Sequence, residues 1–265
     1  MFRAIFPERK WFDYETFFSC SRKPLGFFDS YTQQNPQNTL SMQQAAEACY
    51  ALYAITGKQH YKTHGVEIMD YLCLYQQVWS PAWLSCELLG GFGVQNTDGE
   101  WSDSRQGYFA VTLMKYYQLT GQQEYFERGV AALRAMFSLF ESPESPRTAE
   151  NYAHGAKDRL AGVTGLHWGT GSSVVSIHLI RQLYGDAYVN VRNQWGVGID
   201  GCRIPAVRVK GQTIYVELLD NVASSRTATV IFGSLSRKNY ELTVNGKSLG
   251  KFSSKELQKG VDVDI

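Results

Sequence analysis

A repeated motif constrains the fold of this chain more than any other feature of its sequence. The segment Tyr53–Tyr61, with a Thr-Gly pair at its centre, recurs 64 positions later as Tyr117–Tyr125. A weaker third copy at the same spacing contains Tyr184 and Gly185. Such a repeat is too long for a tetratricopeptide or ankyrin unit, which has about 33 or 34 residues. It fits a helical hairpin that is followed by a long connection.

Each copy of the repeat has the pattern of apolar-striped helices that end at glycine. Apolar residues recur at intervals of three and four positions, which is the spacing of a buried helix face. Glycine ends a helix at little cost because it readily adopts the left-handed conformation. The pattern predicts first helices over residues 41–55, 106–119 and 172–184, and second helices over 59–77 and 122–140.

Three long connections, over residues 23–40, 78–105 and 141–171, each precede the first helix of a copy. Because short turns join the helices of a hairpin, these connections are expected to lie together at the opposite end. Loops of this length are either functional or disordered, and these are rich in aromatic residues and glycine. We expect loops 80–104 and 142–171 to meet at one rim and to form a shared mouth.

The last part of the chain has the pattern of β-strands. Polar and apolar residues alternate on both sides of Lys210–Gln212 and again over 227–232. Asn245–Gly246 is the favoured signal for a type I′ hairpin. The sequence therefore predicts a mainly α protein with a C-terminal β module. Its helical-hairpin domain is expected over residues 1–190 and its small antiparallel β-sheet domain over 191–265.

Composition and charge exclude several classes of protein. The chain has 265 residues, 19% of them charged, and a net charge of +1, which excludes an intrinsically disordered or strongly basic nucleic-acid-binding protein. No apolar run approaches the ~18–20 residues of a membrane span. The five cysteines have neither CxxC nor zinc spacing, so we expect no metal and no cofactor. Residues 1–15 lack a signal-peptide core, which predicts a cytoplasmic protein, or a periplasmic or secreted one if an upstream signal is missing.

The first candidate site is an acidic loop, in which Asp98, Glu100 and Asp103 flank Trp101. Glycoside hydrolysis needs two carboxyl groups, one protonated to assist the leaving oxygen and one ionised to activate water or to attack. A neighbouring aromatic ring can stack on a sugar, and it can raise a carboxyl pKa by excluding water. We therefore nominate the three acidic residues as catalytic and Trp101 as substrate-binding.

Two other interpretations of this loop stay open. In the first, the loop is a turn in which Asp103 or Ser104 caps the helix that follows. In the second, the alternating oxygen ligands Asn96, Asp98 and Glu100 bind calcium, although their spacing is not that of an EF-hand.

The second candidate site is the glycine-rich segment 150–173. Glycine lets backbone N–H groups approach a ligand, and the segment opens a helix whose N-terminus favours an anion such as a uronate carboxylate. It lacks the Lys-Ser/Thr pair and the preceding strand of a nucleotide-binding loop. We nominate Tyr152 and His154 as catalytic. The nominated substrate-binding residues of this segment are Asn151, Arg159, His167 and Trp168.

A structural role is the alternative for the second segment. His167 and Trp168 would then pack under the hairpins, and Gly169–Ser173 would only cap a helix. His154 lies outside any helical stripe, so packing alone gives little reason for an imidazole there. A catalytic His154 is expected to be dispensable for stability, whereas a structural one would be buried and hydrogen-bonded.

The repeated hairpins with their Tyr…Thr-Gly…Tyr pattern resemble those of the six-hairpin, (α/α) toroid glycosidases and of polysaccharide lyases with related architecture. The resemblance covers residues 40–190 and implies a partial toroid, because the chain has room for about three hairpins, half of a ring. Three explanations stay open: a C-terminal portion of a longer enzyme, an open ring, or a ring completed by the missing half or by a second copy. The resemblance also implies a β module after the ring.

The resemblance implies a carbohydrate-active protein of polysaccharide degradation with a carbohydrate substrate. The charge and the lack of a long apolar run predict that neither nucleic acid nor membrane is a partner. The acidic loop favours a glycoside hydrolase that acts on an acidic polysaccharide or oligosaccharide. A polysaccharide lyase is the alternative, since Asn151, Tyr152, His154 and Arg159 are similar to the residue set with which toroid lyases neutralise a uronate and remove its C5 proton. A non-catalytic glycan-binding or scaffold fragment is the third possibility.

Overall fold

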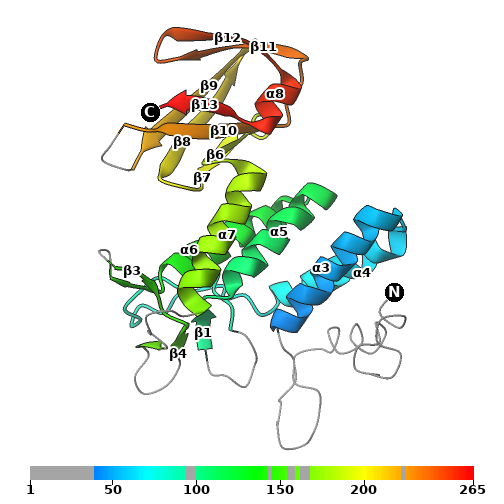
Figure 1. Ribbon diagram of the computed structural model, residues 1–265, viewed down its shortest axis with the longest axis vertical. Helices are drawn as coiled ribbons and strands as arrows, with labels where there is room; N and C mark the ends of the chain where they lie inside the picture. The colour runs from blue at the N-terminus through cyan, green and yellow to red at the C-terminus, as the bar shows by residue number, and fades with distance from the viewer. Residues whose placement is uncertain (1–38, 94–99, 143–144, 154–158, 162–167, 222–224) are drawn as a thin grey trace, which may run out of the picture. The chain divides into compact units, whose positions relative to one another are not determined.

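The computed structural model describes six segments of the chain: residues 39–93, 100–142, 145–153, 159–161, 168–221 and 225–265. The chain divides into two compact units, residues 1–176 and 177–265 (Figure 1). The predicted domain boundary between residues 190 and 191 stays a prediction. None of the helices in the described segments is long and apolar enough to cross a membrane.

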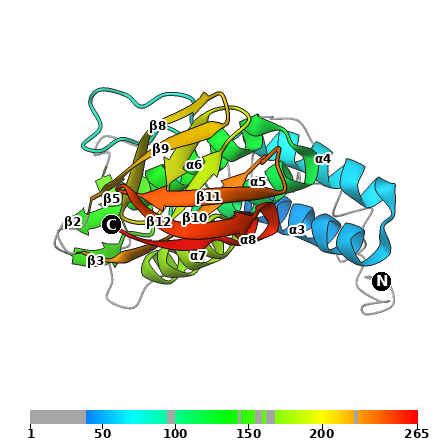
Figure 2. The same ribbon diagram turned by 90° about the horizontal axis from the view of Figure 1, so that it is seen from above.

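Two helical hairpins and the start of a single further helix form the helical part of the first unit, and the first two copies of the repeat predict the hairpins. Gly57 and Gly121, with φ values of 64° and 76°, end the first helix of each hairpin in the left-handed conformation. The first and second helices of each hairpin pack along each other (Figures 1 and 2). The helices are α3 (Thr39–Thr56), α4 (Gln59–Cys73), α5 (Gln106–Thr120), α6 (Gln123–Phe137) and a single helix α7 (Trp168–Tyr184).

One buried and one half-buried polar contact join the first helices of the two hairpins. The Tyr116 hydroxyl donates to the carbonyl oxygen of Ala46 over 2.8 Å, and Lys115 pairs with Glu47 over 2.8 Å. Gly65 lies in α4 where a Cβ would overlap the Tyr116 hydroxyl. The equivalent Gly129 in α6 faces Met114 instead, with 3.0 Å between its ideal Cβ and Met114 Cγ.

Gly65→Ala is therefore expected to destabilise the fold by about 1–3 kcal/mol, because overpacking displaces a buried, hydrogen-bonded tyrosine. Gly129→Ala is the matched control from the second copy of the repeat. Its loss should be smaller, because a flexible methionine can move aside and alanine favours a helix over glycine by ~1 kcal/mol. Urea unfolding of both variants measures the difference, and equal losses would contradict this account of the two glycines.

The prediction of a mainly α fold is wrong, because the long connections themselves form strands. Each of these strands has only three or four residues, which is too few for a local hydrophobic period to stand out. The third copy also lacks a second helix: after Gly185 the chain enters a strand with every residue buried. The described elements are therefore not a half-ring of three hairpins. The strands of the first unit are β1 (Glu100–Asp103), β2 (Phe140–Ser142), β3 (Ser145–Thr148), β4 (Asn151–Ala153) and β5 (Arg159–Ala161).

The second unit contains a four-stranded sheet in the order β13-β10-β6-β7 and two separate hairpins, β8-β9 and β11-β12. Strands β10 and β6 run parallel, so the predicted antiparallel module is corrected to a mixed one. Asn245 and Gly246 have φ values of 50° and 81°, which agrees with the predicted type I′ turn. The elements are β6 (Ala187–Asn190), β7 (Trp195–Gly198), β8 (Cys202–Lys210), β9 (Thr213–Asp220), β10 (Thr227–Gly233), β11 (Asn239–Val244), β12 (Lys247–Ser253), α8 (Ser254–Lys259) and β13 (Val261–Asp264).

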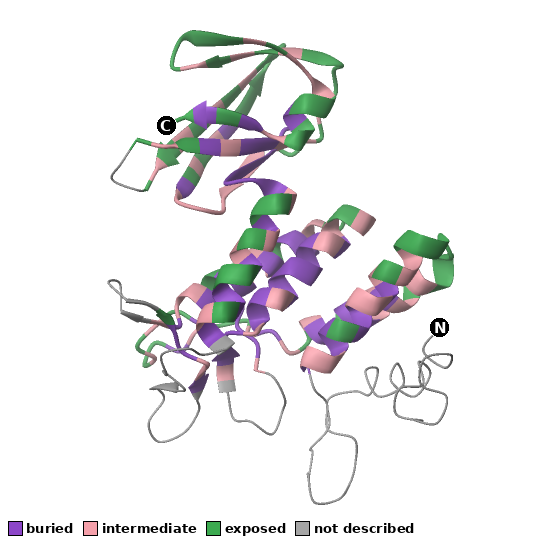
Figure 3. Cartoon of the chain, in the orientation of Figure 1, coloured by how far each residue is buried: buried purple, intermediate pink, exposed green. Residues whose placement is uncertain are grey.

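The apolar core of the second unit lies mainly on its four-stranded sheet (Figure 3). Strand β6 is buried throughout and β13 is buried at alternate positions. The inward positions of β9 and β11, in contrast, are only half-buried. The inner face of the four-stranded sheet is therefore buried, whereas the inner faces of the two hairpins are partly exposed.

Candidate functional site

The candidate site of the first unit is built on a three-stranded antiparallel sheet in the order β1-β4-β5. Strand β1 belongs to the loop 80–104, and β4 and β5 belong to the loop 142–171. Their pairing confirms the prediction that the two loops meet. A further backbone bond joins the two loops, since the Ser104 amide donates to Glu150 O over 2.7 Å, and the Asp103 amide donates to Phe92 O within the first loop over 2.8 Å.

The register of this sheet gathers half of the nominated residues. Asp103 lies opposite Asn151. One row further along β4, Ala153 has Glu100 on one side and Arg159 on the other. Residues directly opposite share a face of an antiparallel sheet, and alternate residues of a strand return to it. Asp103 and Asn151 therefore share one face of the sheet, and Tyr152, the next residue of β4, lies on the other.

Asp103 is held by Arg105 in a buried, two-point ion pair. Arg105 donates from Nε to Oδ1 over 2.7 Å and from Nη2 to Oδ2 over 2.6 Å, and its backbone N–H donates to Oδ1 over 2.8 Å. Arg105 Nη2 also lies 3.6 Å from Glu150 Oε1. Burial raises the pKa of Asp103, and its bonds from Arg105 oppose that rise. The carboxylate thus closes a turn just before α5, whose N-cap Arg105 has no side-chain cap of its own, and this geometry favours the turn interpretation of Asp103.

Tyr152 is almost completely buried, with 1% of its surface exposed. It packs in an apolar cluster with Leu88, Leu139 and Ala149. Its hydroxyl forms a 2.8 Å hydrogen bond with Ser85 Oγ. A base that removes a proton from a sugar must reach the sugar ring, so these contacts favour a structural role for this tyrosine.

Three tryptophans make an aromatic group beside the sheet. The ring of Trp101 lies 6.5 Å from that of Trp79, which lies 5.8 Å from that of Trp83, and both pairs are edge-to-face. Trp101 packs on the buried Tyr152 cluster, whereas Trp79 is 52% and Trp83 is 67% exposed. Sequence reasoning missed the last two. Their signal was two tryptophans in a long connection, outside any helical stripe.

The start of α7 is packed against strand β3. A Cβ at Gly169 would overlap the carbonyl oxygens of Thr148 and Ala149. The Ser173 hydroxyl lies 3.0 Å from Thr148 Oγ1 and 2.8 Å from Gly169 O. Carbonyl oxygens close to the first turn repel an anion, so this geometry favours the capping interpretation of Gly169–Ser173.

Several nominated residues lie outside the described residues: Asp98, His154 and His167. For Glu100, Arg159 and Trp168 the structure describes only the backbone position, in β1, in β5 and at the start of α7. Their roles stay predictions. Among the residues that are described, no group of three or more His, Cys, Asp or Glu side chains could hold a metal ion.

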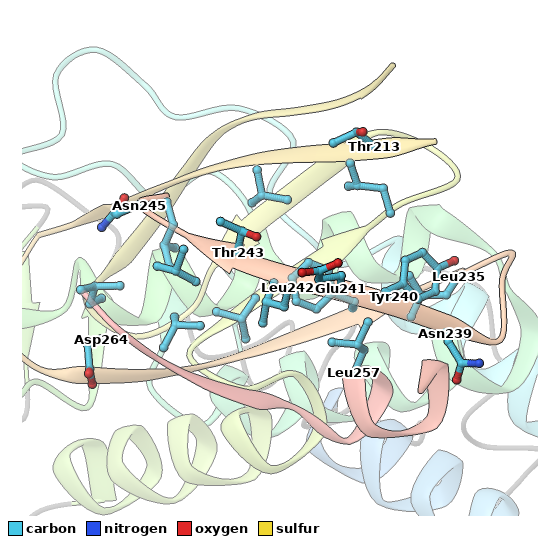
Figure 4. A pocket seen from close by; sticks show the side chains of 18 of the residues that line it. Thr213, Leu235, Asn239, Tyr240, Glu241, Leu242, Thr243, Asn245, Leu257 and Asp264 are labelled. Carbon is cyan, nitrogen blue, oxygen red and sulfur yellow. The ribbon is translucent and has the colours of Figure 1, made fainter. Parts of the chain in front are cut away.

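The second unit contains a cavity of about 590 Å³ that both apolar and polar side chains line (Figure 4). It is lined by β9, β10, β11, β13 and α8. None of the nominated site residues lines it. The cavity is therefore a feature separate from the sheet of the first unit.

Comparisons with known proteins give a partial structural likeness. No family model and no curated protein matches the chain. Solved structures of the GH76 α-1,6-mannanase of Salegentibacter sp. HEL1_6, including an inactive variant with α-1,6-mannotetrose, align with TM-score 0.46 and 15% identity over 55% of this chain and 41% of that one. A GH76 α-mannanase of Bacteroides thetaiotaomicron aligns with TM-score 0.40 and 18% identity over 59% and 38%. The chain thus spans about two fifths of the length of these glycoside hydrolases, and the likeness is too partial to transfer their activity or substrate.

Proposed function

We propose that this chain is a glycoside hydrolase whose site lies on the sheet β1-β4-β5. The observation that carries the proposal is the pairing of β1 with β4, which brings the acidic loop to the glycine-rich segment. A hydrolase needs carboxyl groups beside a surface that holds a sugar. The strand that carries Glu100 also carries Trp101, and the ring of Trp101 contacts that of the exposed Trp79.

The proposed roles follow from burial and register. Asp98 and Glu100 are the proposed acid and base or nucleophile. Asp103 positions Arg105 and the start of α5 and does not react, because its two oxygens are engaged by Arg105. Arg159, in the same row as Glu100, is the proposed cation for an acidic sugar.

The experiment is an assay of the purified chain on a panel of neutral and uronate-containing polysaccharides. Hydrolysis releases reducing ends without the ultraviolet absorbance of an unsaturated uronate, which a lyase would produce. Loss of turnover in Glu100→Gln, with wild-type folding, supports the proposal. Glycan binding without turnover by the wild-type chain would contradict it and favour a binding module.

Trp79 and Trp83 are expected to bind the sugar chain by stacking. Trp83→Ala should weaken glycan binding roughly tenfold, the equivalent of about 1.4 kcal/mol. Because the ring is exposed, stability should change by less than about 1 kcal/mol. Tyr215→Ala is the matched control, an exposed aromatic residue of the second unit. Calorimetric titration with the glycan that the chain cleaves measures the affinity of both variants. Equal affinities of Trp83→Ala and Tyr215→Ala would exclude the tryptophans from the glycan-binding surface.

A further inference from the structure

The cavity of the second unit lies along two strands that each pair on one side. Within the described strands, β9 pairs with β8 alone and β11 with β12 alone. Both β9 and β11 line the same cavity of about 590 Å³, as Figure 4 shows for Thr213 on one strand and for Glu241 and Thr243 on the other. This volume is in the range of ligand-binding pockets, roughly 300–1,000 Å³.

The side chains that line the cavity alternate along both strands. The inward positions are apolar and half-buried, and the positions between them are exposed. Interiors of proteins are close-packed, so a closed two-layer sheet would bury these side chains against the floor of Val230, Phe232, Leu257 and Val263. In this structure these apolar side chains are only half-buried, so a segment that enters the cavity can make further apolar contact with them. The inward residues are Ile214, Val216, Leu218, Tyr240, Leu242 and Val244.

The charges of the four hairpin strands distinguish the inner edges from the outer ones. Strands β8 and β12, at the outer edges, carry basic residues, which commonly protect a strand edge from pairing. Strands β9 and β11 carry no basic residue, and each has one exposed glutamate, Glu217 and Glu241, the second opposite Lys251 of β12. Arg237, just before β11, also lines the cavity and donates to Gln212 over 3.0 Å. The basic residues of the outer strands are Arg203, Arg208, Lys210, Lys247 and Lys251.

We propose that this cavity binds an extended segment of another polypeptide, which adds a strand between β9 and β11. Backbone N–H and C=O groups at a strand edge seek partners, and a peptide strand supplies them together with apolar side chains at alternate positions. An acyl chain would fill the volume without meeting those groups. On the solvent side the added strand lies between Glu217 and Glu241, so its outward residues are lysine or arginine. The partner is thus a segment that alternates apolar and basic residues.

The test is a fluorescence-polarisation titration of the full chain with a labelled nonapeptide in which valines alternate with lysines and threonines. A peptide of identical composition with its valines in one block is the control. The alternating peptide should bind and the blocked one should not. The double variant Glu217→Lys with Glu241→Lys should weaken binding by roughly fivefold or more, the effect of two opposite-charge cross-strand pairs. It should also bind a peptide with glutamates in place of lysines more tightly than wild type does.

Matched variants separate the groove from general charge effects. Arg208→Glu, on an outer strand, should leave the affinity unchanged. Leu242→Arg should abolish binding, and Leu249→Arg, on β12 outside the cavity and 40% exposed, should not. Circular dichroism checks the fold of each variant. If Leu242→Arg does not fold, the double variant Glu217→Lys with Glu241→Lys still tests the proposal.

Four results would overturn the proposal. The first two are equal binding of the two peptides and no binding of either. The third is binding of palmitate that the alternating peptide does not displace. The fourth is self-association of the chain that Leu242→Arg abolishes, because a second copy would then be the occupant. Hydrogen exchange of the free chain gives a further check. The amides of β9 that point away from β8 should exchange fast and become protected by the peptide, whereas protection without it would show that the edge is already paired.

Discussion

Replacing Asp103 with alanine is expected to cost about 3 kcal/mol of unfolding free energy. The substitution leaves the partly buried Arg105 without its two-point partner, and breaking a fully buried pair costs ~3–5 kcal/mol. Asp103 is 1% exposed and the Arg105 side chain 23% exposed, and Glu150 at 3.6 Å compensates in part. The start of α5 also loses the acceptor of the Arg105 amide. Urea unfolding followed by circular dichroism measures the loss.

Glu150→Gln is the control for this prediction. Glu150 is partly exposed and lies farther from the same guanidinium, so its loss should cost less than about 1 kcal/mol. Equal effects of the two substitutions would show that Asp103 is not the anchor of Arg105. A stable Asp103→Ala variant that has lost all glycan turnover would return Asp103 to a catalytic role.

Replacing the carboxyl groups that precede Asp103 should have the largest effect on activity. Asp98→Asn and Glu100→Gln are each expected to lower kcat by about 10²–10⁴-fold, the usual contribution of a general acid or base. Asp103→Asn should retain turnover per folded molecule, because its proposed role is structural. The comparison needs kcat corrected for the folded fraction of each variant.

His154→Ala is the corresponding test of the second loop. A catalytic imidazole predicts the same loss of kcat with a change in stability of less than about 1 kcal/mol. If this variant turns over glycan at the wild-type rate, the site reduces to the acidic loop. If the two carboxyl variants are also active, the whole assignment is wrong.

The repeat predicted the helices of the first unit because their signals are local. Thr-Gly pairs mark where α3 and α5 end, and the three-to-four spacing marks the buried faces. The strands β1, β4 and β5 escaped prediction because each has three or four residues, too few for a period of two to stand out. The pairing of β1 with β4 also depends on contacts about fifty residues apart in the sequence, which no local pattern records.

The sequence predicted which two loops form the candidate site, but it predicted the roles of the individual residues less well. Acidic, aromatic and glycine-rich composition marked the two loops that β1 and β4 join. The burial of Tyr152 and the engagement of Asp103 by Arg105 depend on packing, which residue type does not reveal. Trp79 and Trp83 have the same residue type as Trp101, and only their exposure and ring contacts single them out.

The most direct test of hydrolysis at this sheet is mass spectrometry of the products that the chain releases from an oligosaccharide. Glycoside hydrolysis adds one water for each linkage cleaved, whereas elimination adds none and leaves an unsaturated sugar. The account predicts products that together carry one added water per cleavage by the wild-type chain, and none from Glu100→Gln at matched time. Unsaturated products, or equal cleavage by Glu100→Gln, would contradict it.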